Sequence, residues 1–175
     1  MRCAIWCPAN WTDGRDLQTY RRVVSAAPLP FQRGSGALGS GNPTRHQGVP
    51  WHFAPPAGIK SPPLSFATRV GDLLFISGIP GFDDKGALAD GFEAQFGFVV
   101  ANIKRVLGEA GGSFRDLVKV NVLLTRASDV ATMNVLYASA FGPAPYPART
   151  TCVVQALPDP KMLIEIECVA SLAKT

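Results

Sequence analysis

The clearest pattern of apolar and polar residues in the chain lies between residues 91 and 110. Apolar side chains recur there at intervals of three and four, which places them on one face of an amphipathic helix. Asp90 is the expected N-cap, and Gly111 with Gly112 is the expected C-terminal stop. The helix is predicted to bury Phe92, Phe96, Val99, Val100, Ile103, Val106, Leu107 and Ala110.

A second helix is predicted after residue 129. Ser128 or Asp129 is the expected cap, and Gly142 ends the pattern. Three prolines follow within five residues and predict a stiff loop that ends at Pro147. The apolar face of this helix is expected to hold Val130, Met133, Leu136, Tyr137 and Phe141.

Short runs rich in β-branched and aromatic residues predict the strands. Two of them, 65–69 and 73–77, flank a tight turn at Val70-Gly71-Asp72. In the last run, apolar residues alternate with Glu165 and Glu167, so one strand face is apolar and the other acidic. The remaining predicted strands are 117–125, 150–157 and 163–172.

The order of these elements is β-β-α-β-α-β-β, which predicts an α+β domain with a mixed sheet and both helices on one face. Nothing in the chain covers the opposite face of that sheet. Because a large apolar patch seldom stays exposed, we expect the domain to self-associate into a homo-oligomer.

The first 60 residues have a different composition. They contain 14 of the 32 glycines and prolines and offer little apolar surface to offset the entropy of ordering. We therefore divide the chain into a basic extension, 1–60, and a domain, 61–175, with a short helix expected at 16–25. An organelle transit peptide and a wrongly chosen upstream start codon would both give such an extension, and the sequence leaves the two open.

Charge follows the same division. The extension carries seven basic and two acidic residues, whereas residues 61–175 carry ten basic and eleven acidic ones, so +5 and −1 give the net +4. A basic extension could contact nucleic acid or anionic lipid, but we favour a solvated tail. No apolar run reaches the ~18–20 residues of a membrane span, so we expect a soluble protein with no membrane or nucleic-acid partner.

The four cysteines are scattered, which fits a reducing compartment and predicts a cytoplasmic protein. Targeting by residues 1–60 stays open. Cys3, Cys7, His46 and His52 could in principle gather a zinc ion, but their spacing is not that of a zinc knuckle. We expect no metal and no cofactor.

Arg149 is the strongest candidate for chemistry in the domain, which contains no histidine to act as a general base. It follows the proline-rich loop and precedes a predicted strand. A guanidinium there could bind a carboxylate through two parallel hydrogen bonds. The residues alone leave an equal alternative, a structural ion pair with Glu165 or Glu167.

The domain resembles the RidA/YjgF family of enamine/imine deaminases over residues 62–173. The matching stretches keep the family's order and spacing. They are 70–78 (VGDLLFISG), Gln95, Asn102, 111–113 (GGS), 116–120 (DLVKV), 134–137 (NVLY), 147–149 (PAR), 157–158 (LP) and 164–170 (IEIECVA).

The resemblance implies the small chorismate-mutase-like α+β fold and a homotrimer with active sites between subunits. It implies that Arg149 grips the carboxylate of a 2-imino acid and that Glu165 orients or activates water. It also places Gly78 and Thr151 in the pocket, with Thr151 where a cysteine is often found. Ser77 and Asn134 match pocket positions too, although a strand-end hydroxyl and a helix-packing amide are alternatives for them.

Three further positions bear on activity. Leu64 stands where the family has an aromatic residue, and Phe66 could supply apolar area in its place. Ile79 replaces a glutamine and is expected to make the pocket rim more apolar. Glu167 could be functional or could edge a solvated or intersubunit surface. The competing hypothesis is a non-catalytic protein that binds small carboxylates, and a ribonuclease has weaker support.

Overall fold

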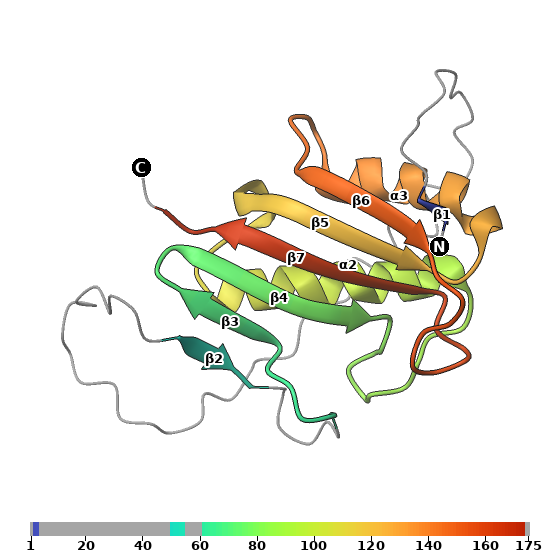
Figure 1. Ribbon diagram of the computed structural model, residues 1–175, viewed down its shortest axis with the longest axis horizontal. Coiled ribbons are helices and arrows are strands. Elements are labelled where there is room, and N and C mark those ends of the chain that lie inside the picture. The colour runs from blue at the N-terminus through green and yellow to red at the C-terminus, as the bar shows by residue number, and fades with distance from the viewer. Residues whose placement is uncertain (1, 4–49, 55–60, 174–175) are drawn as a thin grey trace.

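The computed structural model describes residues 2–3, 50–54 and 61–173. They form a seven-stranded sheet with two long helices stacked on one of its faces, as Figure 1 shows. The strand order across the sheet is β1-β6-β5-β7-β4-β3-β2. The strands are β1 (Arg2–Cys3), β2 (Trp51–Phe53), β3 (Ala67–Val70), β4 (Leu73–Pro80), β5 (Leu117–Leu124), β6 (Ala148–Val153) and β7 (Ile164–Ser171). The helices are α2 (Phe92–Glu109), α3 (Val130–Phe141) and the short 3₁₀ turns η1 (Phe114–Asp116) and η2 (Ala127–Asp129).

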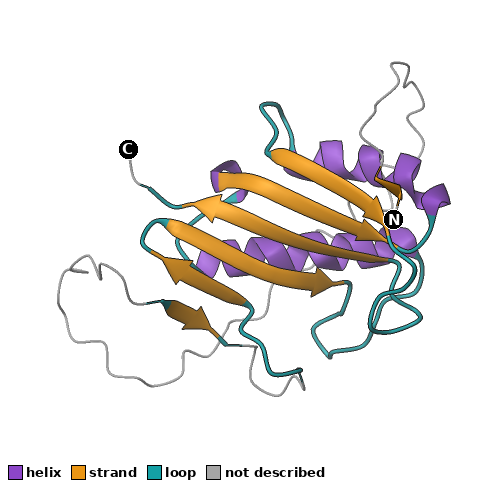
Figure 2. Cartoon of the chain, viewed as in Figure 1, coloured by secondary structure: helices purple, strands orange, loops and turns teal. Residues whose placement is uncertain are grey.

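The predicted β-β-α-β-α-β-β order is confirmed from β3 to β7, and so is the mixed sheet with both helices on one side (Figure 2). The first hairpin turns at the predicted place, because Val70 pairs with Leu73 and Gly71 has a φ of 58°. Glycine adopts this left-handed conformation without the steric cost that a side chain would add.

Both helices begin and end close to the predicted residues, but neither is capped as predicted. The N-cap of α2 is Gly91, with a φ of 83°, and no side chain caps the helix. The prediction that Asp90 is the N-cap was therefore wrong. Asp129 does sit at the N-cap of α3, yet its carboxylate accepts two hydrogen bonds from Arg126 instead of capping the helix. The C-terminal stop of α2 is confirmed, with Gly111 at a φ of 81°.

The sheet is antiparallel except for one pair within the described residues. β5 and β6 run parallel, joined by the crossover helix α3, whereas β7 lies antiparallel between β5 and β4. A parallel pair requires a connection of this length, because a tight turn can only reverse the chain. The crossover therefore brings the face of α3 back over β6.

The core lies between the sheet and the helices. It includes Phe96 and Ile103 of α2, Met133 of α3, and Ile164 and Ile166 of β7. The other face of the sheet leaves large apolar side chains in solvent in the single chain. Leu73 and Phe75 of β4 are 43% and 45% exposed. Among the residues that the structure describes, this face is uncovered, as expected.

The sheet extends into the segment that we assigned to the extension. β2 pairs with β3 through Trp51 and Arg69, and β1 pairs with β6 through Cys3 and Cys152. The boundary near residue 61 stays a prediction, but strand pairing does not begin there. The helix expected at 16–25 lies outside the described residues.

Two broader expectations concern the whole chain. Among the helices that the structure describes, none has both the length and the apolar character needed to cross a membrane. Within the same ranges, His, Cys, Asp and Glu side chains form no group of three or more able to hold a metal ion. Cys7 and His46, two of the four candidate zinc ligands, are not in those ranges.

Candidate functional site

Arg149 lies within β6, whereas the sequence placed it just before a strand. The predicted strand began at Thr150 and ran to Leu157, whereas β6 spans Ala148–Val153 because its pairing with β5 sets its limits. Arg149 is opposite Val120, whose side chain is fully buried against the helices. Since neighbours in register share a face, the Arg149 side chain leaves the sheet on the helix side.

Residues of α3 contact the Arg149 guanidinium and hold it in place. Its Nη2 donates to Oδ1 of Asn134 at 2.7 Å, and its Nη1 lies 3.8 Å from the Met133 sulfur. Within the described part of the chain it forms no ion pair with Glu165 or Glu167, so the structural ion pair is not found. Asn134 therefore contacts the predicted carboxylate-binding residue.

Tyr137 lies under the same guanidinium. Its ring centroid is 4.5 Å from Cζ of Arg149, which is cation–π geometry. Burial raises the pKa of the Tyr137 hydroxyl above its ordinary value, while the positive charge of Arg149 opposes that shift. The sequence placed Tyr137 only on the apolar helix face. The signal that could have marked it is its position three residues after Asn134, one helical turn away.

Glu165 belongs to a second group of residues on β7 and β4. Ile164 and Ile166 face the core, so Glu165 between them points to the uncovered face. Its carboxylate lies against Gly78, where a built Cβ would stand 2.7 Å from Cδ of Glu165. Burial raises the pKa of the Glu165 carboxyl, and the nearby charge of Glu167 raises it further.

Ser77 adjoins this second group. Its hydroxyl donates to the carbonyl of Ser65 at 2.7 Å, so one of its hydrogen-bonding roles is structural. Ser77 and Gly78 interrupt the regular pairing of β4 with β7, which shifts between Ile76 and Ile79. This irregularity brings the Gly78 backbone next to Glu165.

Polar pairs continue along the uncovered face. Glu167 accepts a hydrogen bond from Asn121, and the Lys119 ammonium donates to the Thr150 hydroxyl, each at 2.5 Å. These side chains satisfy one another across neighbouring strands. Glu167 therefore lies two residues from Glu165 with its position fixed by Asn121.

The two groups lie on opposite faces of one sheet. Arg149 and Glu165 are two strands apart, and their partners on β5, Val120 and Leu123, are three residues apart. At ~4.8 Å per strand and ~3.3 Å per residue, their Cα atoms are separated by about 14 Å, with side chains that diverge. The structure brings Arg149 together with Asn134, and Glu165 together with Gly78, but it does not join the two groups in one chain.

One expectation about the pocket rim is corrected. Ile79 is 3% exposed, so it adds almost no apolar surface, because it faces the core in register with Ile166. Phe66 is partly buried against the core and keeps some exposed area, so its contribution to a pocket stays a prediction. Leu64 is 41% exposed and does present an apolar side chain. Thr151 shares the strand face of Arg149, and its hydroxyl is buried with no hydrogen-bond partner in the described ranges.

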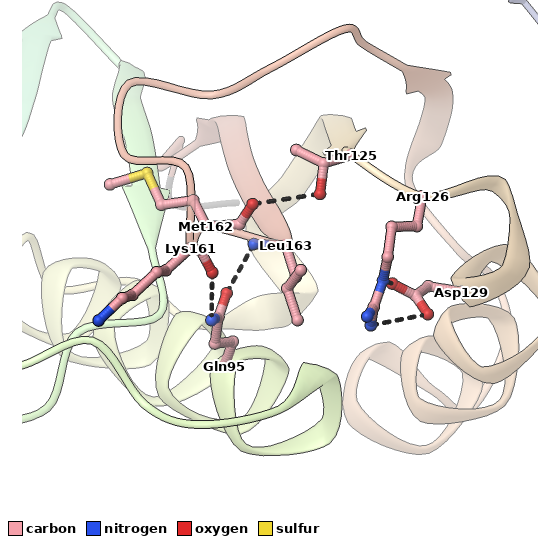
Figure 3. Close-up of polar contacts among 7 residues, drawn as sticks. All are labelled: Gln95, Thr125, Arg126, Asp129, Lys161, Met162 and Leu163. Carbon is pink, nitrogen blue, oxygen red and sulfur yellow. Dashed lines mark hydrogen bonds and ion pairs between the residues drawn. The ribbon is translucent and has the colours of Figure 1, made fainter.

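Gln95, one of the motif residues, ties two loops to α2. Its amide donates to the carbonyls of Ala89 and Lys161 and accepts from the Leu163 amide. Figure 3 shows the bonds to Lys161 and Leu163. A cavity of about 390 Å³ opens beside it, lined in part by Phe82 and Asp159. It is lined by none of the predicted site residues.

Cysteine chemistry has little support in this arrangement. Burial raises the pKa of the Cys168 thiol to about 12, with a further contribution from the charge of Glu167. A thiol with that pKa carries almost no thiolate at neutral pH, and the thiolate is the nucleophile. The Cys168 thiol is therefore a poor candidate for a nucleophile.

Comparisons with known proteins agree with this architecture. The family model described as Endoribonuclease L-PSP matches residues 58–172. A RutC family protein of Pyrococcus abyssi is 41% identical over 110 residues, which cover 62% of this chain and 85% of that protein. Reactive Intermediate Deaminase A, chloroplastic, of Arabidopsis thaliana is 37% identical over 112 residues, which cover 63% and 59%.

A solved structure gives the same result for the fold. RidA from the Antarctic bacterium Psychrobacter sp. superimposes with a TM-score of 0.61 at 41% identity, covering 64% of this chain and 90% of that one. The fold is therefore the chorismate-mutase-like α+β fold of these proteins. With the family model matched over more than half of the sequence, the chain belongs to the RidA/YjgF family, the family of the Endoribonuclease L-PSP model.

Proposed function

We propose that the protein hydrolyses short 2-imino or enamine acids to 2-oxo acids and ammonia. The observation that carries this proposal is the exposed Arg149 guanidinium, seated by Asn134 and Tyr137 and paired with no described carboxylate. Its planar fork of donors matches a carboxylate. The relative named Reactive Intermediate Deaminase A supports the reaction class.

We call Arg149 with Asn134 and Tyr137 one half-site, and Glu165 with Gly78 the other. Each half-site has one task in the proposed reaction. Arg149 fixes the substrate carboxylate, which places the adjacent C=N carbon. Glu165 accepts a proton from water as the water oxygen bonds to that carbon, and the nitrogen takes up a proton from solvent as the C=N π pair moves onto it. In the tetrahedral intermediate, Glu165 returns its proton to the nitrogen, the C–N bond breaks to release ammonia, and the carbonyl forms as the hydroxyl loses its proton to solvent. A carboxyl whose pKa is raised by burial is a stronger base once it is ionised.

We also propose that two copies form each active site and that the assembly is a homotrimer. One chain keeps Arg149 and Glu165 about 14 Å apart on opposite sheet faces, so the Glu165 that serves Arg149 must come from a neighbour. The exposed Leu73 and Phe75 provide apolar surface for that contact. Light scattering is expected to give three times the mass of the chain; a monodisperse monomer would contradict the shared site.

The activity test generates 2-iminopropanoate with an amino-acid oxidase and traps it with semicarbazide. Wild-type protein is expected to divert the imine from the trap, and Arg149→Ala and Glu165→Gln are expected to lose that effect. Arg126→Ala is the matched control, because that arginine pairs with Asp129 instead. No diversion by the wild type, or equal diversion by Arg149→Ala, would reject the deaminase.

Mixed assemblies test the shared site. Arg149→Ala and Glu165→Gln chains, refolded together in equal amounts, are expected to recover about a quarter of wild-type activity, because a quarter of the interfaces combine two intact halves. Each variant refolded alone is expected to stay inactive. If the mixture recovers nothing while trimers form, the two residues act within one chain.

A non-catalytic carboxylate-binding protein is the alternative, and the exposed Leu64 favours it because leucine cannot supply a hydroxyl to a substrate. Binding of pyruvate without hydrolysis of 2-iminopropanoate would support the non-catalytic alternative. A ribonuclease has less support, since both histidines lie before residue 61 and the rest of the chain is slightly acidic.

We propose a cytoplasmic location. The test is whether residues 1–60 direct a protein to an organelle. Among the relatives, the Arabidopsis protein is named chloroplastic and the Schizosaccharomyces pombe protein mmf2 mitochondrial. A fusion of residues 1–60 to a fluorescent protein is expected to stay diffuse in a eukaryotic cell. Accumulation in an organelle would identify the segment as a targeting peptide.

A further inference from the structure

We propose that the aromatic ring of Tyr137 is a positioning element that fixes the plane of the Arg149 guanidinium for carboxylate binding. The inference rests on the proposed function, because it concerns the same carboxylate site. It assigns to Tyr137 a role that its place on an apolar helix face did not suggest. The role belongs to the ring and not to the hydroxyl.

A row of aromatic rings leads from Phe114 of η1, through α3, to Arg149. Phe114 meets Phe141 edge to face at 4.9 Å, and Phe141 stacks on Tyr137 with 4.0 Å between centroids and 5° between planes. Cζ of Arg149 then lies 4.5 Å from the Tyr137 centroid. Phe141 and Tyr137 are both 4% exposed, so close packing holds them in place.

Two contacts restrain different motions of the guanidinium. The hydrogen bond from Nη2 to Asn134 fixes one corner of the group, but it allows rotation about that bond. The Tyr137 ring underneath restrains this rotation, because a cation is attracted to the ring face. Asn134 and Tyr137 are three residues apart on α3, so one helix provides both restraints.

The Tyr137 hydroxyl does not take part. Its oxygen is buried and has no hydrogen-bond partner among the residues described, so it does not reach a ligand in solvent. Burial keeps its pKa above the ordinary value, and the group stays protonated and neutral. Tyr137→Phe keeps the aromatic ring and loses only the hydroxyl. It is therefore the matched control for Tyr137→Leu, which removes the ring.

The test measures binding of pyruvate, the 2-oxo acid product of the proposed reaction, by titration calorimetry. Tyr137→Phe is expected to keep the wild-type Kd within about twofold, and Tyr137→Leu to weaken it about 2- to 30-fold, the range of a cation–π contact. Arg126→Ala, which removes an arginine paired with Asp129, is expected to leave the Kd unchanged. Thermal unfolding and light scattering establish that each variant is folded and assembled.

A spectroscopic signature separates positioning from general packing. The Nε–H proton of Arg149, identified by its absence from the spectrum of Arg149→Ala, is expected upfield because the ring current of Tyr137 shields it. Tyr137→Phe keeps this shift and Tyr137→Leu loses it. If Tyr137→Leu does not fold, Tyr137→Met carries both measurements, since methionine adapts to irregular core space.

The inference is overturned if Tyr137→Leu binds pyruvate as tightly as wild type, or if Tyr137→Phe loses as much affinity as Tyr137→Leu. Its failure differs from failure of the proposed function. A wild type that binds pyruvate with the expected variant pattern but diverts no imine rejects only the deaminase. A wild type that diverts imine while Tyr137→Leu keeps full affinity rejects only the positioning role.

Discussion

Replacing Gly78 with alanine adds one methyl group where β4 touches the Glu165 carboxylate. The new Cβ would lie 2.7 Å from Cδ of Glu165, whereas ordinary contact begins at 3.4 Å, so the carboxyl carbon must retreat by at least 0.7 Å. The φ of Gly78 is outside the left-handed region, so the backbone accepts alanine without strain. The perturbation therefore falls on the end of one side chain.

Stability and activity should respond very differently. A side chain pushed from its preferred rotamer costs about 0.5–1.5 kcal/mol, which changes the unfolding free energy little. A base displaced by nearly 1 Å from its productive position can cost about 100-fold in rate, so we expect kcat to fall about 10- to 100-fold. The imine-trapping assay gives kcat, and urea unfolding gives the free energy.

Gly81→Ala is the matched control. A Cβ on Gly81 would stand 2.6 Å from Cα and Cβ of Gln95, and the core holds those atoms. Overpacking of this kind costs about 1–3 kcal/mol, so Gly81→Ala should lose stability while its folded fraction keeps its activity. The reasoning is refuted if Gly78→Ala keeps kcat within twofold of wild type, or loses activity only in step with its folded fraction.

Four further outcomes are expected. The acidic limb of the kcat/KM profile should reflect the raised pKa of Glu165 and move to lower pH in Glu167→Gln, because a neighbouring negative charge is removed; an unmoved limb argues against Glu165 as the base. By linkage, the stability associated with Glu165 is present below its ordinary pKa and is lost as pH rises through the raised one, so Glu165→Gln should be more stable than wild type at neutral pH in urea titrations. Asn134→Asp should raise KM more than Asn134→Ala in steady-state assays, since a carboxylate beside Arg149 competes with the substrate; the reverse order would contradict this. Gln95→Leu should lose about 2–5 kcal/mol of unfolding free energy, because three main-chain groups lose their partner, and a loss under 1 kcal/mol in urea would count against the loop-tying role.

Local patterns were enough to predict most of the elements. The three-and-four spacing between residues 91 and 110 located α2 to within one residue at each end, because burying a stripe of apolar side chains is what forms such a helix. The predicted cap was wrong, since Gly91 takes the N-cap with a positive φ that no side-chain rule anticipates. β2 was missed because its strand character depends on pairing with β3, and the glycines and prolines around it hid that partner.

The candidate site was less accessible from sequence. The sequence placed Glu165 on a strand and Arg149 just before one, but which face each occupies depends on the register of β6 and β7 against β5. Pairing between distant segments leaves no periodic mark in the sequence. Spacing correctly predicted Tyr137 as a core residue, but its contact with the Arg149 guanidinium depends on the crossover of α3.

The two half-sites are also expected to form at different times during folding, because only one of them lies within the crossover from β5 to β6. Arg149 and Asn134 are 15 residues apart in the chain, within one crossover unit, so their contact closes a short loop. Gly78 and Glu165 meet only when β7, the last strand, enters between β4 and β5. Contacts of such long sequence separation form late, so a nascent chain is expected to form the contact of Arg149 with Asn134, the proposed carboxylate clamp, before Glu165, the proposed base, is in place.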